Sequence, residues 1–155
     1  TELPMAASLL LCGSFKAGVR ALEGLISRCE VDYGYQGFAD FGRIYLAEFY
    51  IALSQKTDRR PPPLSVVLKN LWFLVRAKPM AARRAHALLE VARRNPIFDA
   101  GGVHSARIAY DLGLIYKSTG RAALAREQFE RARAAAAAQK AEALRTKIDA
   151  AIASL

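Results

Sequence analysis

Few residues in this chain belong to the types that perform catalysis or hold a metal ion. Its 155 residues include two histidines and two cysteines. No neighbouring cysteine or carboxylate forms a recognisable pattern with His86 or His104, and the interval between Cys12 and Cys29 matches no metal-binding motif. Arginines surround His86, so we interpret it as a surface or partly buried side chain rather than a general base.

Phosphate binding has no motif either. In a nucleotide-binding loop, Lys and Ser or Thr would follow the glycines, and they do not follow Gly101 and Gly102. We therefore predict no catalytic, cofactor-binding or metal-binding residue and no enzymatic activity for this chain. Two cysteines are too few for a disulfide framework, so they favour a reducing, cytoplasmic compartment, where both would be small buried apolar side chains.

The net charge of +9 is concentrated in the middle of the chain. Residues 56–94 carry ten basic and two acidic side chains, whereas residues 1–55 carry four basic and six acidic ones. Such a basic segment suits nucleic acid, an anionic membrane, an acidic protein surface or a solvated helix face. Among partners we favour an acidic face of an adjacent domain, because the segment contains no recognisable helix for reading bases. The arginines that would make the contact are Arg83, Arg84, Arg93 and Arg94.

The elements that must position these charges are helices. Apolar residues recur at intervals of three and four, and Gly and Pro separate the periodic segments, so we predict an all-α protein with no strand. The predicted helices span 3–11, 15–29, 38–53, 64–77, 81–94 and 105–117, the last of them capped by Ser105. From 121 onward, one long helix and two helices with a tight turn near Gln139 both fit.

Two features concern the hydrophobic surface. No stretch reaches the roughly 20 apolar residues that a membrane-spanning helix needs. Trp72 stands beside Phe73 in a strongly apolar predicted helix, where such a pair is either core or an interface anchor. We favour the core.

Part of the last third follows the spacing of a helical repeat. The residues at the repeat positions are Leu112, Gly113, Tyr116, Gly120, Ala125, Phe129 and Ala132. This pattern resembles the tetratricopeptide repeat, in which small residues let two antiparallel helices approach and aromatic rings fill the space between them. Ala109 and Ala137 depart from the family, which often has Trp and Pro at these positions.

Further copies are weaker. Gly42 and Tyr45 repeat the first-helix pattern, with the partner helix displaced to residues 81–94 and an insertion between them. The expected organisation is a single domain of helix pairs: a worn repeat at 1–31, a repeat with an insertion at 35–95, a clear repeat at 106–139 and a C-terminal capping helix at 140–155. We expect the chain to be a fragment of a larger protein, with an antiparallel helix-pair array as its fold.

The resemblance extends to a larger architecture. The segments 68–77 (LKNLWFLVRA), 79–91 (PMAARRAHALLEV) and 109–121 (AYDLGLIYKSTGR) are similar to the C-terminal helical region of bacterial class III adenylate/guanylate cyclases. Similar tails also follow ATPase modules in bacterial transcription regulators. The resemblance implies a protein-protein or interdomain regulatory module in signal transduction; the alternative is a segment of a nucleic-acid-associated regulator that uses the basic region 56–94. A homodimer formed through an apolar end face is a further possibility.

The resemblance to the tetratricopeptide repeat also indicates candidate partner-binding residues. First helices of the repeats line the concave groove of the family, which implicates Asp40, Arg43 and Asp111 as peptide contacts, unless they are simply solvated. Lys117, Arg83 and Arg84 complete the candidates.

Overall fold

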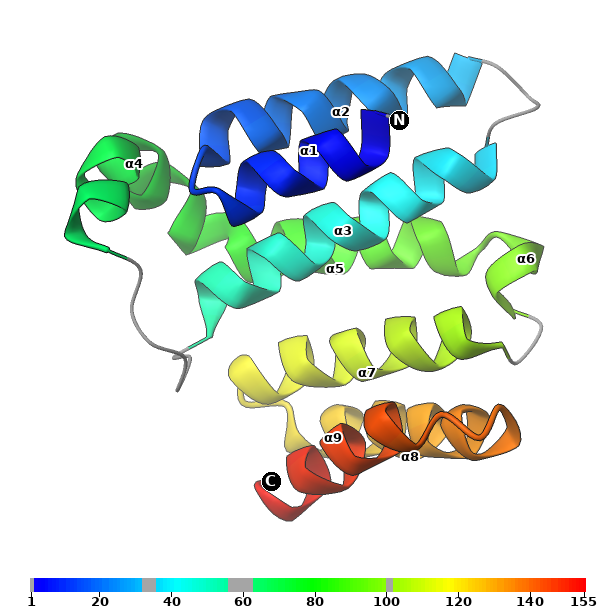
Figure 1. Cartoon of the computed structure of the whole chain (residues 1–155). Helices are drawn as coiled ribbons and strands as arrows, with labels where there is room; N and C mark the ends of the chain where they lie inside the picture. The colour runs from blue at the N-terminus through cyan, green and yellow to red at the C-terminus, as the bar shows by residue number, and fades with distance from the viewer. Residues whose placement is uncertain (1, 32–35, 56–62, 100–101) are drawn as a thin grey trace. The chain divides into compact units, whose positions relative to one another are not determined.

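The structure of the protein, a computed structural model, describes residues 2–31, 36–55, 63–99 and 102–155. Within these ranges the chain is all-helical and contains no strand, so the predicted all-α class is confirmed, whereas the antiparallel helix-pair array stays a prediction. The helices form two compact units, Thr1–Leu88 and Leu89–Leu155, which are described separately below (Figure 1). The predicted division into repeats stays a prediction.

The first unit begins with three adjacent helices (blue to cyan in Figure 1): α1 (Glu2–Leu11), α2 (Phe15–Val31) and α3 (Gln36–Ser54). A tight turn joins α1 to α2. Gly13 adopts a φ of 77°, a conformation that only glycine reaches without strain, and the Ser14 backbone N–H donates to the Leu9 carbonyl at 2.8 Å. The chain therefore reverses within three residues and α2 packs along α1.

Small residues bring these helices close together. A Cβ on Gly18 would lie 2.6 Å from the Leu10 side chain, and a Cβ on Gly42 would lie 3.0 Å from Ile26. The core between the helices contains the fully buried side chains of Leu22, Ile44 and Tyr50. Tyr45, a predicted packing residue, instead keeps 37% of its surface exposed.

Two more helices complete this unit. α4 (Leu64–Ala77) continues through one 3-10 turn, η2 (Lys78–Met80), into α5 (Ala81–Arg93), whose last residues belong to the second unit. Pro79 lies in the 3-10 turn, where its missing N–H leaves no helical hydrogen bond unmade. The predicted helices 64–77 and 81–94 thus correspond closely to α4 and α5.

The second unit contains α6 (Pro96–Asp99), α7 (Val103–Ser118), α8 (Ala122–Ala138) and α9 (Glu142–Ala153). α7 and α8 pack tightly. The Phe129 ring lies over Gly113, so that a Cβ on this glycine would be 2.5 Å from ring carbons. Ala125 and Ala132 are buried in the same cluster as the ring, and Tyr116 packs against this cluster. Leu112 is buried as well.

Two residues with positive φ end the helices of this unit. Gly120 has a φ of 75° between α7 and α8, a left-handed conformation that glycine adopts without strain. Lys140 has a φ of 53° between α8 and α9, and the Ala141 N–H donates back to the Ala136 carbonyl at 2.9 Å. The chain from 121 onward therefore forms two helices, although neither Gly nor Pro marks the break.

Some local predictions are wrong. α7 begins at Val103 with Gly102 as its N-cap, so Ser105 lies inside the helix and does not cap it. Cys12 is exposed rather than buried, because it follows the last residue of α1, and Cys29 is partly exposed. The short helix α6 was not predicted. Residues 32–35 and 56–62, which separate predicted helices, lie outside the described residues.

Tyr110 makes the stability of the second unit sensitive to alkaline pH. Burial raises the pKa of its phenol above the usual value of about 10, and the charge of Asp111 raises it further. The unfolded chain ionises Tyr110 first, so the stabilisation is complete below about pH 10 and is lost as pH rises through the folded-state pKa. We expect urea unfolding between about pH 9 and 11 to show a steeper loss of stability for the wild type than for Tyr110→Phe. Equal slopes would contradict this assignment.

Candidate functional site

One face of α4 exposes an unusual run of large apolar side chains. The exposed fractions are 73% for Leu64, 62% for Leu68, 50% for Leu71, 71% for Trp72 and 59% for Val75. Because an α-helix turns once in about 3.6 residues, this spacing places all five on one side of α4, along about 16 Å of its length. We call these five residues the α4 apolar face.

The opposite side of α4 attaches the helix to the first unit. The Asn70 side chain is buried, and its Nδ2 donates to the Gly13 carbonyl and to the Val66 carbonyl, each at 2.8 Å. The Phe73 ring packs on Phe49 with ring centroids 6.2 Å apart. A buried amide that joins two elements is costly to leave unpaired, so it fixes which side of α4 points inward. The α4 apolar face is consequently the outer side.

A pocket of about 470 Å³ adjoins the α4 apolar face and shares Trp72 with it. Five of its lining residues are cationic: Lys16, Arg20, Lys69, Arg76 and Arg84. The others are Asn70, Trp72, Phe73 and Ala77, so no carboxylate is present among the described lining residues. We call this feature the basic pocket. Its residues come from α2, α4 and α5, all within the first unit.

Packing holds part of this positive charge in place. The Arg76 guanidinium lies over the Trp72 ring, 4.9 Å from its centroid. Arg84 donates to the Tyr50 hydroxyl at 3.0 Å and stands 5.7 Å from that ring's centroid. Lys69 Nζ donates to Ser14 Oγ at 3.3 Å. Cations held on aromatic rings keep their charge while losing side-chain freedom, which favours binding of an anionic group.

The chemistry available at this site is binding. Its lining contains cations, aromatic rings and one amide, which can hold a ligand through charge, packing and hydrogen bonds. The described residues contain no group of three or more His, Cys, Asp or Glu side chains that could hold a metal ion. Apolar and cationic groups side by side suit a ligand that is itself both apolar and anionic.

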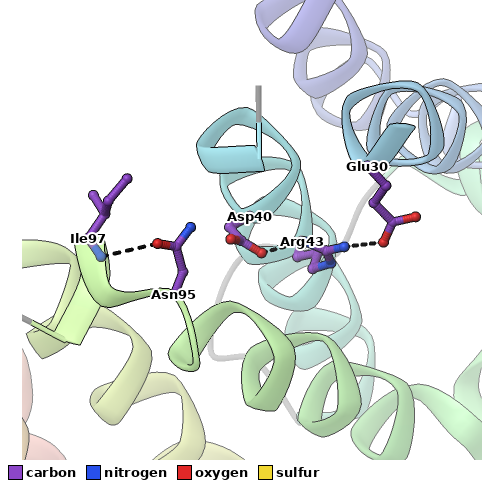
Figure 2. Close-up of polar contacts among 5 residues, drawn as sticks. All are labelled: Glu30, Asp40, Arg43, Asn95 and Ile97. Atoms are coloured by element: carbon purple, nitrogen blue, oxygen red, sulfur yellow. Dashed lines mark hydrogen bonds and ion pairs between the residues drawn. The ribbon is translucent and has the colours of Figure 1, made fainter. Parts of the chain in front are cut away.

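The predicted contacts Asp40 and Arg43 have a structural role within the first unit. Both are buried in α3, where the Arg43 guanidinium bonds the carboxylate of Asp40 and also that of Glu30 on α2 (Figure 2). These ion pairs join α2 to α3. Figure 2 also shows Asn95, whose Oδ1 accepts the Ile97 N–H at 3.1 Å at the start of α6.

The remaining predicted contacts are distributed over both units. Asp111 is buried in α7, and Lys117 donates to the Ser154 hydroxyl near the end of α9. Arg83 is exposed on α5. Arg84 alone among the predicted contacts lines the basic pocket. Partner binding by these residues stays a prediction.

The sequence reasoning missed most of the site that the structure presents. Trp72 is 71% exposed, so the predicted core position is wrong for this residue. α4 is apolar on two sides, and the periodicity alone did not indicate which side packs inward. A usable signal was Asn70, since a single amide among apolar residues marks the side with a specific hydrogen-bond partner.

The two histidines lie on different helices. His86 is partly buried on α5, and His104 is exposed on α7 with its ring 5.7 Å from that of Phe98. In the described ranges, no helix combines the length and the apolar character needed to cross a bilayer.

Comparisons of the chain with protein families, with curated proteins and with solved structures find no match. The case for a function therefore depends on the geometry and charge of the site itself.

Proposed function

We propose that this chain is a protein-interaction module that binds a partner through the α4 apolar face. The observation that carries the proposal is the exposure of five large apolar side chains on one side of one helix. Water contact with so much contiguous apolar surface is unfavourable, and burial against a partner relieves it. The opposite side of α4 is already packed, so α4 cannot bury both sides within the unit.

The wider proposal is that the module belongs to the tetratricopeptide type and acts as a regulatory segment. The close pairing of α7 and α8 at Gly113 and Phe129 supports the repeat type, because the repeat depends on such a contact. A bacterial signalling context and a parent adenylate/guanylate cyclase follow only from the sequence resemblance, and a cytoplasmic location follows from the low cysteine count. Reading the coding sequence upstream of Thr1 tests the parent: a cyclase catalytic domain supports it, and an unrelated domain removes it.

Peptide binding tests the interaction function. The probe is a helical peptide of about sixteen residues with Leu spaced to match the α4 apolar face and Glu along one edge. We expect Leu68→Asp to weaken the affinity measured by calorimetry at least about tenfold, because it places a charge in the apolar contact.

The matched control is Ile97→Asp, because Ile97 is also 71% exposed but lies on α6 in the second unit. It should leave the affinity unchanged, and a peptide with the same residues in scrambled order should not bind. Equal effects of the two variants, or equal binding of the two peptides, would refute docking at this face.

A second candidate function is nucleic-acid binding, favoured by the five cations of the basic pocket. Phosphate contacts of this kind lose affinity steeply as salt rises. Filter binding of duplex DNA and of RNA over a salt series decides the matter. If the chain binds neither DNA nor RNA with salt-sensitive affinity, this candidate is removed. If it does bind one of them in this way, nucleic-acid binding replaces the interaction proposal.

A further inference from the structure

The basic pocket narrows the kind of partner that the α4 apolar face accepts. Trp72 belongs to both features, so an occupant that covers the α4 apolar face necessarily borders the pocket. The helical spacing also places Lys69 and Arg76 seven residues apart, on the edge of α4 next to Trp72. The docking surface is thus apolar along its centre and cationic along one edge.

From this arrangement we infer that the partner is an acidic amphipathic helix of another protein. The inference depends on the proposed interaction function and adds the chemistry of the occupant. The other four residues of the α4 apolar face lie four, seven, eight and eleven positions after Leu64. A second helix packs against such a row with apolar residues at the same spacing. Its carboxylates then lie on the edge that faces the cations.

Charge complementarity favours acid on that edge. The five cations of the pocket have no carboxylate among the other lining residues, and three of them are already oriented by Tyr50, Trp72 or Ser14. Carboxylates arriving there gain attraction from groups that need little further ordering. A glutamate side chain can also reach into the 470 Å³ pocket from the edge of a docked helix.

Other occupants fit this surface less well. Nucleic-acid backbone would meet the cations but would leave the α4 apolar face against polar groups. An anionic lipid surface would bury the apolar side chains, yet a flat surface fills no pocket. A second copy of the chain would bring cation against cation, since the same pocket adjoins the same face.

Calorimetry with two helical peptides tests the inference on the full chain. Both peptides carry Leu at the matching intervals, and the first has Glu where the second has Gln along one edge. We expect the Glu peptide to bind about tenfold more tightly near physiological salt, and the difference to shrink at high salt because ions screen the attraction.

A pair of double variants locates the effect. Lys16→Gln with Arg20→Gln removes two exposed pocket cations that lie one turn apart on α2, and it should reduce the advantage of the Glu peptide. Arg121→Gln with Arg126→Gln removes the same charge from exposed positions of the second unit and should preserve that advantage. Equal loss in both double variants would show a general charge effect and overturn the inference.

The outcomes separate this inference from the proposed function. If both peptides bind equally and Leu68→Asp weakens both, the apolar docking stands and the acidic partner is refuted. If neither peptide binds, the proposed function fails and the inference with it. If the chain binds phosphatidylserine vesicles or RNA but neither peptide, the acidic-helix partner is likewise overturned.

Discussion

Replacing Phe129 with alanine is expected to lower the free energy of unfolding of the second unit by about 3–5 kcal/mol. The ring has no solvent exposure, lies directly over Gly113 and has the Tyr110 ring centroid 5.8 Å from its own. Its removal leaves a cavity that the short side chains of Ala125 and Ala132 cannot fill. Urea unfolding followed by circular dichroism measures the loss. Tryptophan fluorescence would not report on this unit, because the single tryptophan lies in the first unit.

The reciprocal change at Gly113 tests the same contact from the other side. Gly113→Ala would place a Cβ 2.5 Å from the Phe129 ring, so we expect destabilisation even though alanine normally favours helix. The control is Gly24→Ala in α2, where the nearest atom is 3.5 Å away and a gain of about 0.5–1 kcal/mol is expected. If both substitutions stabilise the protein, the close approach of α7 and α8 is wrong.

Replacing Arg43 with alanine should lower the stability of the first unit by about 3–5 kcal/mol. The side chains of Arg43 and Asp40 are 10% and 7% exposed, so the variant removes the cation beside a carboxylate that water hardly reaches. Removing the cation from a buried ion pair costs more than the pair itself contributes. Urea unfolding followed by circular dichroism measures this loss.

Arg28→Ala provides the control for that experiment. It removes an arginine–carboxylate pair with Glu2 in the same unit, but the two side chains are 63% and 58% exposed. A solvated pair contributes at most about 1 kcal/mol. Similar losses for Arg28→Ala and Arg43→Ala would contradict the buried ion pair. A double variant with Asp40→Ala should recover part of the loss, because it also removes the buried carboxylate that has lost its cation.

Most helices of this chain could be predicted because residues close to each helix end in the sequence determine where it begins and ends. Periodic apolar residues indicate a helix wherever they continue, and Gly13, Gly120 and Pro79 interrupt them at positions where the structure also changes direction. The break at Lys140 could not be predicted in the same way. A lysine rarely adopts positive φ. Lys140 does so where the chain turns between α8 and α9, which pack against each other.

The site depended on tertiary information that local patterns do not contain. α4 has apolar residues on both sides, and the bond from Asn70 to Gly13, 57 residues earlier in the chain, determines which side is buried. Lys16 and Arg20 lie far from α4 in the sequence, so their charge could not be assigned to a common pocket. Conversely, Asp40 and Arg43 are charged residues of the kind expected at a surface, but their pairing lets them occupy the interior.

The emission of Trp72 tests most directly whether the α4 apolar face is the binding site. This residue is the only tryptophan, is 71% exposed and lies where the α4 apolar face meets the basic pocket. On saturation with the acidic helical peptide, we predict an emission shift to shorter wavelength and reduced quenching by acrylamide, because the indole leaves water. Binding detected by calorimetry without any change in Trp72 emission or quenching would place the partner elsewhere and contradict the account.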